Sequence, residues 1–133
     1  PKPLHAMEIA EWTVAESLGR TKTEKPGTEM KILYLEHRFR IPENWKRKNI
    51  FFELDYPHGI FGWLEVNGRV LNMPSGGGAP FRQILLDGLL KPGNEENVLR
   101  WNPHFLMPQG RNVVIPHGRI ALWPDRPYAP GEK

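Results

Sequence analysis

The sequence predicts an all-β sandwich of about eight short strands. Fourteen prolines and thirteen glycines are spread between short apolar runs, a pattern that indicates short strands joined by many turns. No window shows the three-to-four-residue period of a long amphipathic helix. The 133 residues fit one hydrophobic core, so we expect residues 1–133 to form a single domain with tails at 1–7 and 125–133. Because the chain begins with proline, we expect it to be one module of a larger protein.

The N-terminal third is expected to contain strands and one loop. Residues 6–18 fit either a helix or an extended segment, and the alternation in residues 11–14 favours an edge strand. Residues 19–28 are charged and include Pro26-Gly27, which predicts an exposed loop. Residues 31–41 predict a strand inside a sheet, because its middle is apolar on both faces. This strand would place Ile32, Tyr34 and Glu36 on one side and Leu33, Leu35, His37 and Phe39 on the other.

Residues 63–71 predict a β-hairpin. Leu64 and Val66 alternate with polar or amphipathic residues, so both are expected to face the core. Asn67-Gly68 is a strong hairpin signal, because both residues accept the positive φ that a type I′ turn requires. Residues 69–71 would then pair back as the partner strand.

The glycine-rich segment 74–81 follows this hairpin and raises the question of phosphate binding. No Lys-Ser or Lys-Thr pair follows the glycines, and residues 83–86 form a β-like run where a helix would be needed. We therefore expect a loop that binds no phosphate. Residues 119–123, ending at Pro124, predict the closing strand.

Several segments together resemble a known family. These are residues 38–45 (RFRIPENW), 50–54 (IFFEL), 66–69 (VNGR), 79–81 with 85–90 (APF and LLDGLL), and 91–99 (KPGNEENVL). In order and spacing they resemble the non-catalytic, sugar-binding jelly-roll domain of family 2 glycoside hydrolases, the β-galactosidases and β-glucuronidases. The resemblance implies a galactose-binding-like jelly-roll β-sandwich whose parent enzyme carries its acid and nucleophile in a separate barrel domain. In that family acidic residues follow the last of these strands, whereas residues 101–111 contain none, so Asn67 is the one position carried over.

Composition argues against several other functions. The net charge is +3, and the one dense basic cluster, residues 46–48, is expected to be a solvated turn, so we expect no nucleic-acid partner. There is no long apolar run, so we expect no membrane partner. The chain has no cysteine and therefore no disulfide framework. The cysteine count does not decide the cellular compartment, and an extracellular or periplasmic location is favoured. Five separated histidines, His5, His37, His58, His104 and His117, lack metal-ligand spacing, so we expect no metal and no cofactor.

Glu53 and Asp55 are the carboxylates that deserve a test as a glycosidase pair. They lie two residues apart on one face of a predicted strand, but a solvated outer face explains them better. A chain of 133 residues also has no room for a barrel of about 250 residues. We therefore expect this chain to be non-catalytic.

Carbohydrate binding is the remaining hypothesis, because a sugar site combines an aromatic platform with planar polar groups. Trp12 and Trp45 are expected to pack in the core. The candidate ligand-binding residues are Trp63, Asn67, Trp101, Asn102, His104, Phe105 and Arg111, most of them in or beside the apolar segment 101–111. We expect a carbohydrate-binding accessory domain associated with a glycoside hydrolase. The alternative is a structural spacer that docks a linked catalytic domain.

Overall fold

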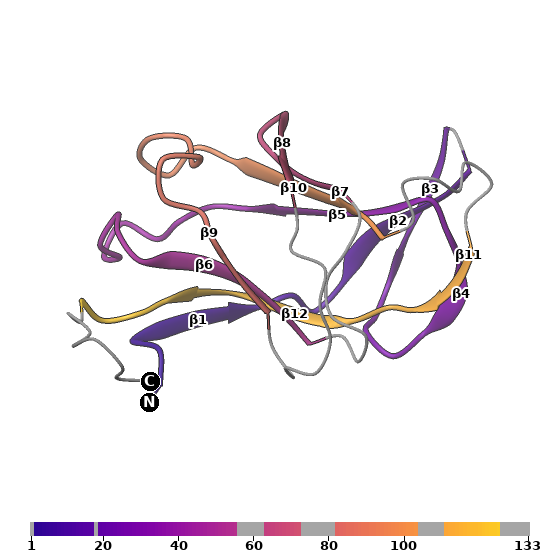
Figure 1. Ribbon diagram of the computed structural model, residues 1–133, viewed down its shortest axis with the longest axis horizontal. Coiled ribbons are helices and arrows are strands. Elements are labelled where there is room, and N and C mark those ends of the chain that lie inside the picture. The colour runs from indigo at the N-terminus through magenta and orange to yellow at the C-terminus, as the bar shows by residue number, and fades with distance from the viewer. Residues whose placement is uncertain (1, 18, 56–62, 73–81, 104–110, 126–133) are drawn as a thin grey trace.

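The structure is a computed structural model that describes residues 2–17, 19–55, 63–72, 82–103 and 111–125 (Figure 1). These residues form twelve strands and no helix, so the all-β prediction is confirmed and the expected number of strands was too low. The strands are β1 (His5–Glu8), β2 (Trp12–Ser17), β3 (Arg20–Glu24), β4 (Glu29–Ile32), β5 (Tyr34–Phe39), β6 (Ile50–Asp55), β7 (Trp63–Val66), β8 (Arg69–Asn72), β9 (Arg82–Leu85), β10 (Asn97–Asn102), β11 (Arg111–Val114) and β12 (His117–Leu122).

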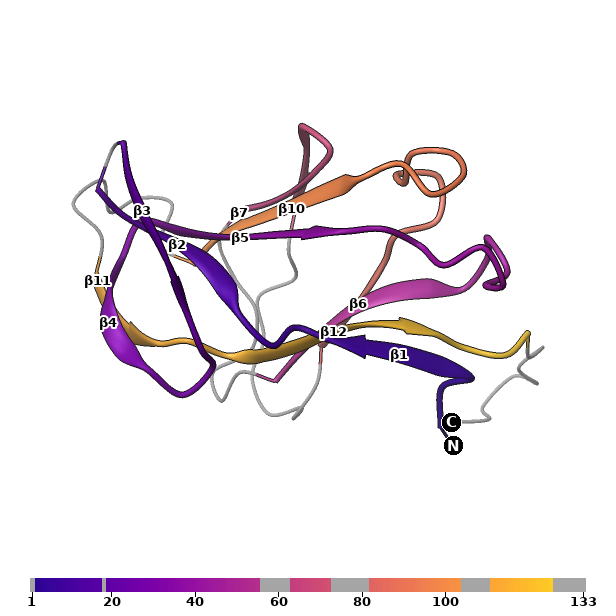
Figure 2. The same cartoon turned by 180° about the vertical axis from the view of Figure 1, so that it is seen from behind.

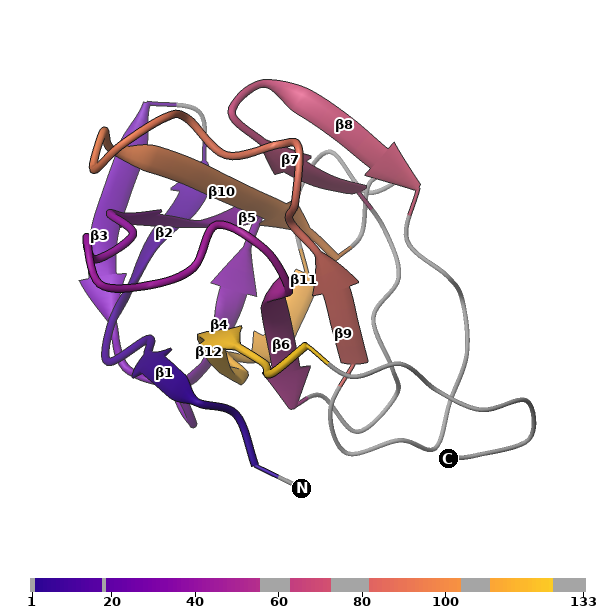
Figure 3. The same cartoon turned by 90° about the vertical axis from the view of Figure 1, so that its left-hand side faces the viewer.

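The strands form three antiparallel sheets. One has four strands in the order β1-β12-β6-β9, one has six in the order β3-β2-β5-β10-β7-β8, and a small one pairs β11 with β4. Figures 1 and 2 show the four-stranded sheet below the six-stranded sheet, with β4 and β11 at one end of the sandwich. Figure 3, viewed from the side, shows β7 and β8 at one edge of the larger sheet and β3 at the other. The predicted sandwich is therefore present.

The core lies between the two larger sheets. Trp12 of β2 meets Phe52 of β6 edge to face, with ring centroids 6.3 Å apart. The buried core side chains include Val14, Leu35, Leu64, Leu99 and Trp101 from the larger sheet and Leu54, Ile120 and Leu122 from the smaller. Trp12 and Trp45 are both buried, as predicted. The Trp12 indole also donates a hydrogen bond to the carbonyl of Pro116 at 3.1 Å.

The predicted hairpin is confirmed. β7 pairs with β8, and Leu64 and Val66 are buried. Asn67 and Gly68 have φ angles of 52° and 83°, the left-handed values that a type I′ turn needs. The strand alternative for residues 6–18 is confirmed by β1 and β2, but the predicted edge position was wrong, because β2 lies between β3 and β5. Residues 82–85 form β9, and β12 is the predicted closing strand.

Three predictions about the N-terminal third were wrong. Residues 20–24, expected to be a loop, form edge strand β3, which is exposed on both faces and so lacks an apolar period. The single strand expected over residues 31–41 is two strands, because the chain leaves the small sheet after Ile32 and joins the large one at Tyr34. The segment expected as an N-terminal tail includes β1, which pairs with β12. β5 itself lies between β2 and β10, as an interior strand should.

Candidate functional site

The outer face of the six-stranded sheet gathers aromatic, charged and amide side chains from three adjacent strands, β5, β10 and β7. We use "outer face" for the side of this sheet that points away from the core. Strand pairing sets Glu36 beside Arg100, and Arg100 beside Glu65, in one row across the sheet. In the next row Asn102 lies beside Trp63. Because residues alternate between faces along a strand, these side chains share one side.

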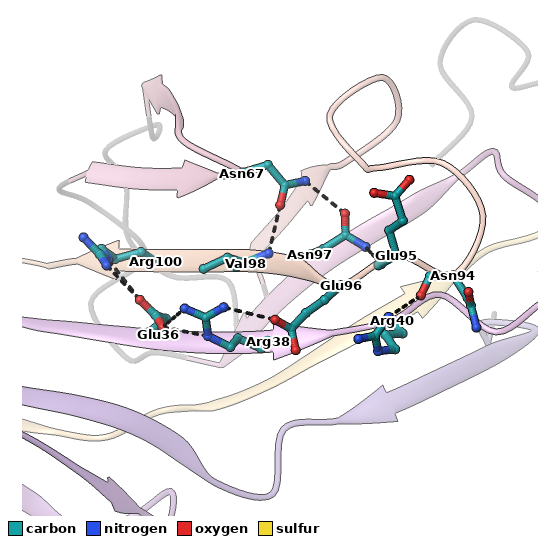
Figure 4. Close-up of polar contacts among 10 residues, drawn as sticks. All are labelled: Glu36, Arg38, Arg40, Asn67, Asn94, Glu95, Glu96, Asn97, Val98 and Arg100. Atoms are coloured by element: carbon teal, nitrogen blue, oxygen red, sulfur yellow. Dashed lines mark hydrogen bonds and ion pairs between the residues drawn. The ribbon is translucent and has the colours of Figure 1, made fainter.

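Glu36 is the centre of this face. Its side chain accepts hydrogen bonds from Arg100, with Nη2 at 2.8 Å and Nε at 3.2 Å from Oε2. Its other oxygen accepts from Nε of Arg38 at 3.2 Å, and Arg38 reaches on to Glu96 at 3.0 Å (Figure 4). With the arginine side chains packed around it, Glu36 is only 8% exposed. A buried carboxylate held by two guanidinium groups is a rigid arrangement.

The two arginines of the cluster stay positively charged. Hydrogen bonding to Glu36 raises the pKa of Arg100, against a smaller opposing effect of desolvation. For Arg38 the main cause of a raised pKa is its hydrogen bond to Glu96, with Glu36 adding to it. The guanidinium carbon of Arg100 also lies 4.3 Å from the centre of the Tyr34 ring, a cation–π contact. One face of Tyr34 is thus covered from within the protein.

Trp63 is the exposed aromatic of this face. It begins β7, and 49% of its surface is open to solvent, whereas Leu64 beside it is fully buried. Its partner across the strand pair is Asn102, which is half-buried. Neighbouring strands lie about 4.8 Å apart, so Trp63 on β7 is about 10 Å from the Tyr34 position on β5. An apolar ring with amide and charged neighbours at this spacing can contact both the C–H faces and the hydroxyl groups of a sugar.

Among the predicted ligand-binding residues that the structure describes, Trp63 and Asn102 come together on this face. Trp101 is fully buried, so the prediction that it forms a surface platform was wrong. The reason is its register: it pairs with Leu35 on one side and Leu64 on the other, both core residues. Arg111 begins β11 and pairs with β4 in the small sheet. His104 and Phe105 lie outside the described residues, as do the glycine-rich segment 74–81 and residues 126–133 of the predicted tail.

Asn67 holds the hairpin to the turn that precedes β10. Its Oδ1 accepts a hydrogen bond from the Val98 amide at 2.9 Å, and its Nδ2 donates to Oδ1 of Asn97 at 2.9 Å (Figure 4). The same Nδ2 also donates to the carbonyl of Leu89 at 2.9 Å. Asn97 is fully buried and accepts a further hydrogen bond from the amide of Lys91 at 2.8 Å. Both N–H groups of the Asn67 amide are therefore used inside the protein, which makes a structural role the better explanation of this residue.

Glu53 contradicts the prediction of a solvated carboxylate. It points to the outer side of the four-stranded sheet, yet it is 1% exposed. Arg119 donates to it at 2.6 Å, the Trp123 indole at 2.7 Å and Gln83 at 2.5 Å. These donors cover the carboxylate and Arg119 neutralises its charge, so of the two predicted carboxylates only Asp55 is exposed. A carboxylate sealed in this way cannot act on a glycosidic bond, because substrate cannot reach it.

Sequence reasoning missed Tyr34, Glu36 and Arg100 as members of the face. A signal was present, because each alternates with core residues and therefore points outward. What the sequence lacked was the pairing of β5 with β10, which joins residues 64 positions apart.

The described residues show neither a metal-binding cluster nor a membrane-spanning helix. No three His, Asp or Glu side chains there gather closely enough to hold a metal ion. No helix in that part of the chain has the length and apolar character needed to cross a membrane.

Comparison with known proteins identifies the fold. No family model matches the chain, and no curated protein sequence matches it significantly. Among solved structures, a β-D-glucuronidase from Dictyoglomus thermophilum matches with a TM-score of 0.61 and 14% identity, over 92% of this chain and 29% of that one. A β-glucuronidase from Ruminococcus gnavus in complex with D-glucaro-d-lactam matches with a TM-score of 0.58 and 13% identity, over 92% of this chain and 30% of that one.

The chain thus spans less than a third of the length of the enzymes it matches. At this level of identity the likeness concerns the fold. The chain has the fold of one portion of these β-glucuronidases, as the resemblance seen in the sequence predicts.

Proposed function

We propose that this chain is a non-catalytic accessory domain of a glycoside hydrolase and that it binds carbohydrate on the outer face of the six-stranded sheet. The proposal of an accessory domain is supported by the likeness to about 30% of the glucuronidase chains. The proposal that it is non-catalytic is supported by Glu53, whose carboxylate is buried and paired with Arg119.

The observation that carries carbohydrate binding is the half-exposed Trp63 beside Asn102 and the Glu36–Arg100 ion pair. A large apolar ring held at the surface of a rigid sheet is a platform on which a sugar ring can stack. Amide and carboxylate groups at its rim can exchange hydrogen bonds with hydroxyl groups. A single shallow site of this kind is expected to bind with a Kd on the order of 10 µM to 1 mM.

The test is a glycan array followed by titration calorimetry on the chain and two variants. Trp63→Ala removes the platform. Leu85→Ala is the matched control, since Leu85 is 48% exposed and lies on the outer side of the other sheet. Saturable binding that is lost in Trp63→Ala and kept in Leu85→Ala supports the proposal. Binding that survives Trp63→Ala moves the site elsewhere.

A second candidate function is a structural domain that docks a catalytic domain. It is favoured by the outer side of the four-stranded sheet, where exposed Leu85 lies beside Phe51. Apolar surface on a sheet exterior is a common feature of an interface. If no glycan on the array binds, this second function becomes the better account.

A further inference from the structure

The charged groups at the centre of the outer face pair with one another and carry a small net negative charge. Two guanidinium groups, Arg38 and Arg100, meet three carboxylates, Glu36, Glu65 and Glu96, which leaves a net charge of −1. Glu36 contacts both arginines, and Glu65 lies beside Arg100 in the strand pairing. The face is therefore not a basic patch, even though the chain as a whole carries a net charge of +3.

The arginine donors are also committed. Arg100 directs Nε and Nη2 at Glu36. Arg38 directs Nε and Nη2 at Glu36 and Nη1 at Glu96. The bidentate edge that would recognise a sugar carboxylate is already occupied by a carboxylate of the protein. An incoming uronate would have to compete with Glu36 and would approach like charges.

A neutral sugar meets no such obstacle. Its hydroxyl groups can donate to the carboxylate of Glu65, which is only half-buried, and can accept from the remaining N–H groups of Arg100. The Trp63 ring offers its stacking surface whatever the charge of the sugar. The charged side chains around Glu36 therefore distinguish a neutral sugar from a uronate, whereas the Trp63 ring does not.

We infer that the outer face selects uncharged glycans and rejects uronate-containing ones, and that Glu36 sets this preference. This inference rests on the proposed function, because it concerns the ligand class of the same face. It is notable against the fold likeness, since the matched enzymes are glucuronidases. The accessory face would hold neutral parts of a substrate or polymer.

The experiment compares the neutral hexose oligomer found on the array with its C6-oxidised uronate form, which has the same linkage and length. Titration calorimetry is run on the native chain, Glu36→Gln and Glu65→Gln. Circular dichroism checks that each variant is folded. Glu65→Gln removes one negative charge without breaking the Glu36 pairs, so it keeps the test valid if Glu36→Gln fails to fold.

The native chain is expected to bind the neutral oligomer about tenfold or more tightly than the uronate form. This ratio should fall about three- to tenfold in Glu36→Gln, and less in Glu65→Gln, as expected for one charge in a partly exposed cluster. Tighter binding of the uronate form by the native chain overturns the inference and leaves the proposed function standing. A ratio unchanged in both variants overturns the role of Glu36. Binding of neither oligomer overturns the proposed function and the inference together.

Discussion

Trp63 and Trp101 provide the sharpest test of which tryptophan belongs to the core. They lie on neighbouring strands of one sheet, and their side chains leave it on opposite sides. Trp101 is fully buried between Leu35 and Leu64, while Trp63 is 49% exposed. Replacing each by alanine therefore removes the same side chain from two very different surroundings.

The expected costs follow from this burial. Trp101→Ala empties a core site and should lower the free energy of unfolding by about 3–5 kcal/mol. Trp63→Ala removes about 100 Å² of side-chain area that is buried in the folded protein. At 25 cal/mol per Å² this burial stabilises the fold by at most about 2.5 kcal/mol, and by less because the unfolded chain is itself partly compact. We expect about 1–2 kcal/mol. The total stability of such a domain is about 5–15 kcal/mol, so Trp63→Ala should still fold, whereas the loss in Trp101→Ala equals the whole stability at the lower end of that range.

Urea unfolding followed by circular dichroism measures both values, with m checked for two-state behaviour. Trp101→Phe is a useful third variant, because a partly filled site should recover some of the loss. The reasoning is refuted if Trp63→Ala costs as much as Trp101→Ala, or if Trp101→Ala leaves stability unchanged.

Three further predictions concern the polar groups. Asn67→Ala should lower the free energy of unfolding by about 1 kcal/mol more than Asn67→Gly, because glycine keeps the positive φ while both lose the hydrogen bonds; equal losses in thermal unfolding would contradict this. Glu53→Met should lower the free energy of unfolding by about 3–5 kcal/mol, because Arg119 loses its carboxylate partner. The double variant Glu53→Met with Arg119→Met should lose less, since no charge is then left unpaired. Denaturant unfolding measures both, and a greater loss in the double variant contradicts the prediction. Burial lowers the pKa of His37 from 6.5 to about 4, so the unfolded chain binds the proton first and stability should fall as pH drops from 6.5 towards 4, by up to about 1.4 kcal/mol per pH unit. In Tm scans the fall in Tm between pH 6.5 and pH 4 should be smaller in His37→Gln than in the native chain and unchanged in the exposed His5→Gln; an equal fall in His37→Gln and the native chain is the contrary result.

The parts of the fold that sequence could predict are those set by local chemistry. Asn67-Gly68 fixes a type I′ turn because the turn needs two residues that tolerate positive φ. Leu64 and Val66 could be placed in the core because period-two alternation fixes sides within one strand. Local rules of this kind predicted the hairpin, β9 and β12.

The parts that failed depend on long-range pairing. Trp101 has the same neighbours in sequence whether it faces the core or solvent, and only the register between β10 and its partners decides. Glu53 looks like a surface carboxylate because its donors lie 30 to 70 positions away, in Gln83, Arg119 and Trp123. β3 lacked an apolar period because it is an exposed edge strand.

The candidate site shows the same division. Trp63 and Asn102 could be chosen from residue type, as an aromatic and an amide near one hairpin. Glu36 and Arg100 could not, since their ion pair joins β5 to β10 across 64 positions.

The most direct test of the central claim is to map glycan binding onto the sheet by NMR. A neutral oligosaccharide from the array is titrated into isotope-labelled protein, and the amide and indole shifts are followed. The account predicts that the largest changes fall on β5, β7 and β10, including the Trp63 indole N–H. Changes confined to the four-stranded sheet, or none at saturating sugar, would contradict it.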